Sequence, residues 1–305
     1  MIRLVIERLI HATVSLLAVT VLAFGLVRLT GDPALILLPI RGTPEDYARI
    51  RAQLHLNDPL IIQYGRYLTS LAKGDLGQSY TSREPVAGII EQRLGPTLQL
   101  GAVALFLVIG IGIPAGLYSA YWQGGWLDRF SRLIAVLGQS APAFWVGLLL
   151  IYGFAVRLRM LPPGGYGGLN SFILPAATIA LGSGAGIIRL MRSCALDVLS
   201  TDYIRFCRMK GLSEQKVLWK HTLRNAVLPV LTLVGTLTGS LVAGSIVTET
   251  VFAWPGLGQQ MVVSINSRDF PVIQGAVLVF AAVYITINLF VDVMFLLLKP
   301  SLRIT

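Results

Sequence analysis

Charged residues are scarce in this 305-residue chain. Only 13% of its residues are Asp, Glu, Lys or Arg, whereas 54% are hydrophobic, and the mean hydropathy is +0.71. The apolar residues collect in long blocks instead of alternating with polar ones, which excludes an ordinary soluble core and predicts a membrane protein. Apolar and polar residues also do not alternate with the period of two that is typical of β-strands. Because only helices or closed barrels satisfy every backbone group in lipid, the blocks predict helices.

Cysteine and the common catalytic motifs are also lacking. The two cysteines, Cys194 and Cys207, are both expected on the cytoplasmic side, so no disulfide is predicted. The chain has no HExxH, no nucleophile beside a base and no paired carboxylates at membrane depth, so we expect neither an enzyme nor a metal site. It also lacks the phosphate-binding pattern Gly-x-x-x-x-Gly-Lys-Ser/Thr of P-loop ATPases. Without a soluble basic domain, the net charge of +10 does not indicate nucleic-acid binding.

Six apolar stretches are long enough to cross about 30 Å of hydrocarbon at about 1.5 Å per helical residue. They cover residues 9–29, 97–118, 133–156, 172–190, 226–248 and 275–298. The first has no small-residue cleavage site and is expected to stay as an anchor. The sequence therefore predicts an all-α integral membrane protein with six transmembrane helices. Its predicted parts are an N-terminal anchor helix (1–29), an extracytoplasmic cap between helices 1 and 2 (30–96), and a five-helix core (97–305).

The orientation follows from the basic residues in the short connections. One set of connections, with both termini, holds 14 Lys and Arg, whereas the opposite set holds four. Cytoplasmic connections carry this excess, so both termini are predicted to face the cytoplasm. The preference of basic residues for the cytoplasmic side applies only to short connections. The cap is long and its seven bases balance seven acids, so it is expected outside. Helical apolar spacing on either side of Pro59 predicts that the cap is ordered.

Small residues recur in the apolar stretches at a spacing that permits close helix contact. Small residues four apart let two helices approach closely, which in lipid supplies dispersion contact. With 31 glycines in the chain, such spacings also arise by chance, so the packing role and a chance origin both stay open. The candidates are Gly112 with Gly116, and Gly235 with Gly239 and Ala243.

The most polar stretch, residues 202–225, interrupts the apolar part of the chain. Residues 200–202 offer N-caps for a first short helix, and Gly211 is expected to end it in a left-handed conformation. Ser213 is then expected to cap a second short helix, with Glu214 in its first turn. Both arms are too short and too polar to span a membrane. The stretch therefore predicts a helix-glycine-helix hairpin on the cytoplasmic face.

Three roles are open for this hairpin. It could be a solvated connection, an anionic-lipid contact or a docking element for a soluble partner. A solvated connection has no need of Tyr203, Phe206 and Leu212, and Asp202 and Glu214 interrupt the clean basic face that lipid binding favours. A hydrophobic tip ringed by mixed charge suits a groove on a protein.

The hairpin resembles the cytoplasmic "EAA" loop of bacterial ABC importer permeases. Gly211 falls on the family glycine and Leu223 on the family leucine, whereas Arg205, Phe206 and Cys207 fall where Glu-Ala-Ala would be. The form "DYIR…KGLS…KHTLRNAVLP" is similar to the dipeptide, oligopeptide and nickel branch of that family, most of all to a first permease subunit of a dipeptide importer. The stretches "GDLGQSY", "APAFWVG", "TETVFAWPGLG" and "RDFPVIQG" are similar to the same branch.

This resemblance implies an assembly and a mechanism. It implies a second homologous permease, two ATP-binding subunits that hold ATP and Mg²⁺, an extracytoplasmic substrate-binding protein, and the bacterial inner membrane. This chain itself would carry no cofactor. ATP-driven closure of the ATPase subunits would move the hairpin and switch the membrane helices, most simply for di- or oligopeptide import. The residues implied in docking are Tyr203, Arg205, Phe206, Cys207, Arg208, Lys210, Gly211, Leu212, Ser213 and Glu214. The candidates for contact with the delivery protein or substrate are Trp254, Pro255, Gly256 and Leu257.

Two alternatives remain open. The same architecture could import nickel or another small solute. A proton- or ion-coupled secondary transporter is the other alternative, because His11, Glu249 and Asp292 lie in or at the ends of predicted spans, where ionisable groups are often functional. None is predicted at mid-bilayer, where coupling ions are usually held, so structural pairing is the preferred interpretation for all three.

Overall fold

The computed structural model describes the whole chain except residues 1, 31, 39–42, 244 and 299–305, and the side chains of a few neighbouring residues. The described residues are nearly all helical and include no β-strand, only an isolated bridge between Gln78 and Pro85. They form two compact units, one of residues 1–96 and 256–286, the other of residues 97–255 and 287–305. The predicted all-α membrane class is confirmed.

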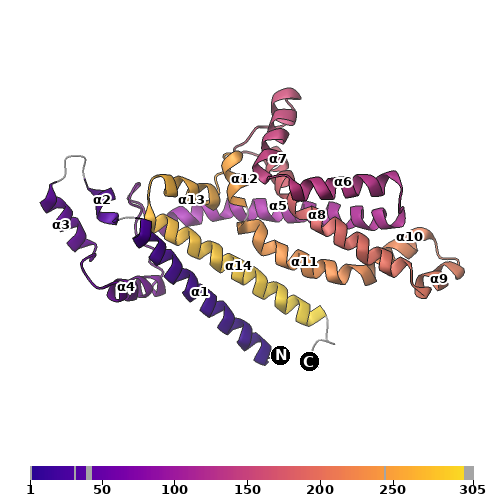
Figure 1. Ribbon diagram of the computed structural model, residues 1–305, viewed down its shortest axis with the longest axis horizontal. Helices are drawn as coiled ribbons and strands as arrows, with labels where there is room; N and C mark the ends of the chain where they lie inside the picture. Colours follow the sequence, from indigo (N-terminus) through magenta and orange to yellow (C-terminus); the bar gives the residue numbers. More distant parts are fainter. Residues whose placement is uncertain (1, 31, 39–42, 244, 299–305) are drawn as a thin grey trace. The chain divides into compact units, whose positions relative to one another are not determined.

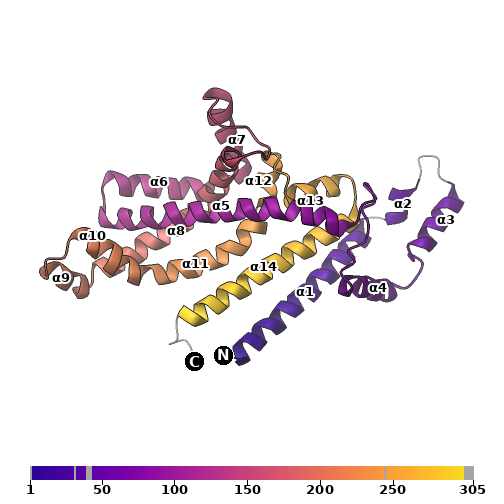
Figure 2. The same cartoon turned by 180° about the vertical axis from the view of Figure 1, so that it is seen from behind.

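The first unit contains the N-terminal helix, the cap and the segment 256–286. Its helices are α1 (Ile2–Thr30), α2 (Pro33–Leu37), α3 (Pro44–Gln53), α4 (Leu60–Ala72), α13 (Leu257–Asn266) and the first parts of α5 (Val86–Tyr121) and α14 (Phe270–Leu298). The start of α14 lies beside the end of α1 in both views (Figures 1 and 2), where the Gln274 side chain donates a hydrogen bond to the Ala23 carbonyl at 3.3 Å.

In the described part of the cap, α2 and α3 each begin with a side-chain N-cap and are joined to each other by side-chain bonds. Asp32 caps α2 by accepting the Ala34 N–H at 2.9 Å, and it also accepts the Tyr47 hydroxyl at 2.6 Å and pairs with Arg51. Burial would raise the pKa of Asp32, but these partners together hold it below its ordinary value. The carboxylate therefore stays charged and ties α2 to α3.

The second unit contains the remaining helices and the hairpin. They are the rest of α5, then α6 (Trp126–Ser140), α7 (Ala143–Leu150), the π-helix η1 (Ile151–Arg157), α8 (Leu169–Leu199), α9 (Asp202–Met209), α10 (Glu214–Lys216), the π-helix η2 (Val217–Thr222), α11 (Leu223–Ala243) and α12 (Ser245–Val251). Helix α8 is the centre of this unit, because α6 and α11 both pack along it (Figures 1 and 2). Its buried residues join those of α5 and α11 in one apolar core.

Five unbroken helices of the described chain are long and apolar enough to span a membrane, and there are six candidate spans if one bent pair of helices is counted as a single span. The bent pair corrects the prediction of one continuous helix over residues 133–156. The chain bends by 116° between α6 and α7. It bends there because Ala141 is extended and the next residue, Pro142, has no N–H to continue the helix. Of the predicted span 226–248, the structure describes α11 up to Ala243 and α12 from Ser245, and residue 244 lies outside the described residues.

Helices α5 and α8 pack closely at two glycines of α5. A Cβ at Gly116 would lie 2.6 Å from the Ile188 carbonyl oxygen and 2.7 Å from the Met191 Cβ, and one at Gly112 would lie 3.1 Å from the Ile187 side chain. Gly235 and Gly239 of α11 are also buried, whereas the Ala243 side chain lies outside the described residues. The Gly112 and Gly116 positions therefore bring two backbones together, as small residues do between membrane helices.

Replacing Gly116 by valine is expected to force α5 and α8 apart and to destabilise the protein by about 1–3 kcal/mol, the usual cost of overpacking. Thermal unfolding of the purified chain measures this loss. The matched control is Gly110→Val on the same helix, where an added Cβ meets nothing within 4 Å. Equal melting temperatures for the two variants would show that the close contact at Gly116 does not exist.

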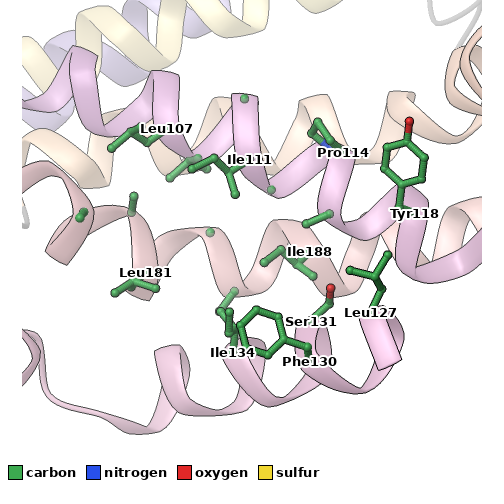
Figure 3. A pocket seen from close by; sticks show the side chains of 18 of the residues that line it. Leu107, Ile111, Pro114, Tyr118, Leu127, Phe130, Ser131, Ile134, Leu181 and Ile188 are labelled. Carbon is green, nitrogen blue, oxygen red and sulfur yellow. The ribbon is translucent and has the colours of Figure 1, made fainter. Parts of the chain in front are cut away.

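An apolar groove of about 840 Å³ opens between α5, α6 and α8. In Figure 3, Leu107 and Ile111 of α5 lie on one side of this space and Phe130 and Ile134 of α6 on the other, with Ile188 of α8 between them in this view. Its lining is almost entirely hydrocarbon. At membrane depth such a surface is compatible with lipid chains or with another apolar helix.

Candidate functional site

The hairpin of residues 202–225 forms where the sequence predicts it. Helix α9 follows its N-cap Thr201 and ends at Met209, after which Gly211 has φ +74°, the left-handed conformation that glycine adopts without a Cβ penalty. The Gly211 N–H donates to the Arg208 carbonyl at 2.9 Å, which closes the end of the helix. Ser213 is extended and begins α10, although its side chain makes no capping bond.

The inner face of the hairpin is a small apolar core. Ile204, Cys207 and Val217 are buried against one another, and Leu212 packs on them from the turn. Sequence analysis grouped Cys207 with the docking residues Tyr203 and Phe206, but the structure places its side chain inside the hairpin. Cys207 and Leu212 therefore hold the two arms together, and in this conformation Cys207 offers no surface to a partner.

The outer face of α9 exposes a row of large apolar side chains. Tyr203, Phe206 and Met209 follow one another at intervals of three residues, and they are 48%, 51% and 78% exposed. The Lys210 ammonium lies 4.5 Å from the centre of the Phe206 ring, so the ring is flanked by positive charge. Exposed apolar residues in a row are costly in water and are typical of a surface that binds a partner.

The charges of the hairpin are divided unevenly. Arg205 pairs with Asp202 at 3.1 Å, and Arg208 forms two bonds with Glu214, at 3.0 and 3.2 Å. Both acids of the hairpin are thus engaged by its own arginines. The remaining bases are all exposed, so the hairpin presents positive charge beside its apolar row. These bases are Lys210, Lys216, Lys220 and Arg224.

The base of the hairpin is braced against the helices that leave it. The Tyr203 hydroxyl lies 2.6 Å from Nδ1 of His221, and the Trp219 indole N–H donates to the Tyr118 hydroxyl at 3.1 Å. Desolvation raises the pKa of Tyr203, so its phenol stays neutral and can donate to His221. The first bond joins α9 to η2, which continues into α11, and the second joins η2 to α5.

Comparison with known proteins agrees with this geometry. Residues 112–304 match the family of binding-protein-dependent transport system inner membrane components, and residues 1–101 match its N-terminal family. The chain belongs to this family of importer permeases. It is 43% identical over 304 residues to the glutathione transport system permease protein GsiC of Escherichia coli strain CFT073, and 42% identical to that of strain K12. Both matches cover 99% of each chain.

The fold of the permease is also found in a solved ABC transporter. It superposes on a chain of the MetNI methionine ABC transporter in an inward-facing conformation, with a TM-score of 0.53 and 19% identity over 69% of this chain and 98% of that one. The resemblance to importer permeases that the hairpin motif suggested is confirmed. The hairpin lies inside the matched range of residues 112–304.

A buried ion pair braces the same end of the permease core, and sequence analysis missed it. Asp128, in the first turn of α6, is 1% exposed and accepts two bonds from the Arg192 guanidinium of α8, at 2.7 and 3.0 Å. It also accepts the Ser119 hydroxyl of α5 at 2.7 Å and the Gly124 N–H at 2.9 Å. One carboxylate thus joins α5, α6 and α8, the helix that leads into the hairpin.

The segment predicted to contact a delivery protein or substrate is largely buried in the structure. The Trp254 ring is fully buried, with Phe172 and Tyr166 at centroid distances of 4.6 and 5.0 Å. Gly256 and Leu257 are buried as well, and Pro255 is only partly exposed. The segment turns sharply after α12, where Ala253 has φ +48° and the Trp254 N–H bonds back to the Glu249 carbonyl at 2.8 Å. That turn points the indole inward, so in this conformation Trp254 holds the fold and has no outer surface.

Two of the three ionisable residues behind the secondary-transporter alternative have described side chains. His11 is exposed on α1, and Glu249 is fully buried on α12, where the Ser245 hydroxyl donates to its carboxylate at 2.7 Å. The Asp292 side chain lies outside the described residues.

Proposed function

We propose that this permease is one membrane subunit of an ATP-driven, binding-protein-dependent importer, and that its hairpin is gripped by an ATPase subunit. The observation that carries the proposal is the exposed row of Tyr203, Phe206 and Met209 on a braced base. An apolar helix face flanked by charge suits insertion into a groove of a soluble protein. The exposed bases around it favour a groove with acidic rims.

The hairpin works as a lever. Its arms are fixed to each other by the inner apolar core, and its base is fixed to α5 through Trp219 and Tyr118. When the ATPase subunits close, the hairpin moves as a unit and shifts α8 and α11, so the permease alternates between outward- and inward-open states. Such coupling needs the ATPase to bind the hairpin in both states while its own geometry differs between them.

The proposed assembly contains this chain, a second homologous permease, two ATP-binding subunits that bind ATP and Mg²⁺, and an extracytoplasmic substrate-binding protein. The excess of bases on one set of connections supports cytoplasmic termini and a place in the bacterial inner membrane. The cap then faces outward. The partner subunits hydrolyse ATP, and this chain supplies part of the pathway by which the substrate crosses the membrane.

Peptides are the proposed substrate class. The support is the relatives' names, because glutathione is itself a small peptide, together with the branch motifs of the hairpin. Discrimination among peptides is assigned to the delivery protein. Uptake of a labelled dipeptide into vesicles that carry the whole assembly, with ATP inside, tests both substrate class and energy source.

Gly211 provides a graded test of the lever in the same vesicles. Gly211→Pro is expected to abolish uptake, because proline cannot adopt φ +74° and also removes the N–H that bonds to Arg208. Gly211→Asn is the matched control: asparagine tolerates the left-handed conformation, and an added Cβ meets nothing within 4 Å. Uptake that survives the proline would show that the bend of the hairpin plays no part in transport.

A further inference from the structure

A second cavity lies in the first unit, between the end of α1 and the cap. It has a volume of about 330 Å³, at the lower end of the range of about 300–1,000 Å³ that small-molecule sites occupy. Apolar and polar groups share its wall. The main lining residues are Phe24, Arg28, Gln63, Arg66, Tyr67 and Phe270.

Three polar atoms of this wall are buried without a hydrogen-bond partner among the described residues: Nε of Arg28, Oε1 of Gln63 and the hydroxyl of Tyr67. Leaving a buried donor or acceptor unsatisfied is costly, and native proteins rarely do so without a reason. Here three such atoms line one cavity. They are the sign of a ligand that brings its own donors and acceptors.

Gln63 shows which group must face it. Its side chain is 8% exposed, and its amide nitrogen donates to the carbonyl oxygens of Leu56 at 3.2 Å and Asp58 at 2.7 Å. These two bonds fix the orientation of the amide. The remaining atom, Oε1, can only accept, so the ligand must present an N–H or O–H to it.

Arg28 shows which charge is needed. One face of its guanidinium lies over the Phe24 ring at 5.3 Å, which helps to fix the group in place. The nearby acids are already engaged, Asp32 by Arg51 and Asp58 by Arg66 at 2.6 Å. A carboxylate is the group that a planar guanidinium binds best together with phosphate.

Water or phosphate would satisfy only some of the groups that line this cavity. Water could bond to Arg28 but would not balance its charge, and inorganic phosphate has no apolar part to pack against Phe24 and Phe270. A carboxylate with an N–H group one carbon away offers both a negative charge to Arg28 and a donor to Gln63. Phe24 and Phe270 form an apolar wall for the rest of such a molecule.

We propose that this cap cavity binds the carboxylate and adjacent N–H of an amino acid or of a peptide C-terminus. The carboxylate lies on Arg28, the N–H donates to Gln63, and the Tyr67 hydroxyl completes the polar contacts. This inference goes beyond the proposed transport function, because it concerns binding to this chain alone. Binding is measured without ATP or uptake, so the two proposals can fail separately.

The test uses the full chain in lipid nanodiscs and ligand-observed NMR with small defined probes. N-acetylglycine, which has both groups, is expected to bind. N-acetylglycinamide lacks the carboxylate and propionate lacks the N–H, and each is expected to bind at least about tenfold more weakly, because each leaves a buried group unpaired. Glycine and triglycine then distinguish the two sources, and binding of either supports the site. Equal binding of all probes, or none by N-acetylglycine, would overturn it.

Two variants tie the binding to the cavity. Arg28→Gln is expected to reduce affinity for N-acetylglycine at least about tenfold, whereas Arg49→Gln, on an exposed arginine of α3 that does not line the cavity, leaves it unchanged. Tyr67→Phe keeps the ring and removes an unpartnered hydroxyl, so it is expected to weaken binding while leaving the melting temperature of the empty protein unchanged or higher. Affinity that neither Arg28→Gln nor Tyr67→Phe changes would place the ligand elsewhere and refute the inference.

Discussion

Replacing Phe206 and Met209 together by aspartate is expected to detach the ATPase from the permease and to abolish uptake. Each side chain loses the burial it would gain in a partner groove, about 1.5–3 kcal/mol per residue, so the pair loses about 3–6 kcal/mol. That loss corresponds to at least about a hundredfold in affinity. Both residues are exposed in the free chain, so the hairpin itself should fold normally. Co-purification of the ATPase in mild detergent measures the effect.

The control for this variant is Thr201→Asp. It also adds a carboxylate to α9, but at the N-cap position, where aspartate is favourable and no large apolar side chain is lost. The ATPase should remain bound to this variant. Normal retention of the ATPase by the double variant would mean that the exposed row does not bind it, and the docking proposal would then be wrong.

Removing the Asp128 carboxylate is expected to have the largest effect on stability. Asp128→Ala leaves the Arg192 guanidinium partly buried without its charge partner, and it also strips the Ser119 hydroxyl and the Gly124 N–H of their acceptor. Breaking a buried ion pair from one side costs about 3–5 kcal/mol. The melting temperature and the yield of membrane-inserted protein should both fall sharply.

A double variant distinguishes the effect of breaking the ion pair from the effect of losing side-chain packing. Arg192→Leu together with Asp128→Leu removes both charges, and replacing both partners of a buried pair is far milder than removing one. The double variant should therefore be more stable than either single leucine variant. Arg132, which is exposed and 3.5 Å from the same carboxylate, supplies the control, because Arg132→Leu should change stability by about 1 kcal/mol or less. If the losses of stability in Asp128→Leu and Arg192→Leu add up in the double variant, Asp128 and Arg192 do not act as a pair.

Much of the fold could be predicted because local chemistry decides it. Long apolar blocks gave the spans, and the hairpin followed from a glycine whose φ is +74° in the structure. The break between α6 and α7 was also visible in principle, since Pro142 lies in the middle of the predicted span. Hydropathy ignores the missing N–H of proline, so the span was predicted as continuous.

The details that could not be predicted from the sequence depend on contacts between distant segments. Tyr203, Ile204, Phe206 and Cys207 lie within two turns of one short helix, and only the position of the second arm decides that Ile204 and Cys207 face inward. Met209 could have been found, because it continues the spacing of Tyr203 and Phe206. Asp128 pairs with Arg192, which lies 64 positions away in the sequence. The burial of Trp254 depends on a turn that the local sequence pattern does not predict.

The most direct test of the lever is a cross-link from its exposed tip. A photoreactive phenylalanine analogue at Met209, in the intact assembly within membranes, is predicted to form an adduct with the ATPase subunit on illumination. The same analogue at Met160, another exposed methionine, on the connection predicted to face outward, should give no such adduct. An illuminated Met209 position that labels only lipid, or nothing, while the assembly still hydrolyses ATP and takes up peptide, would contradict the account.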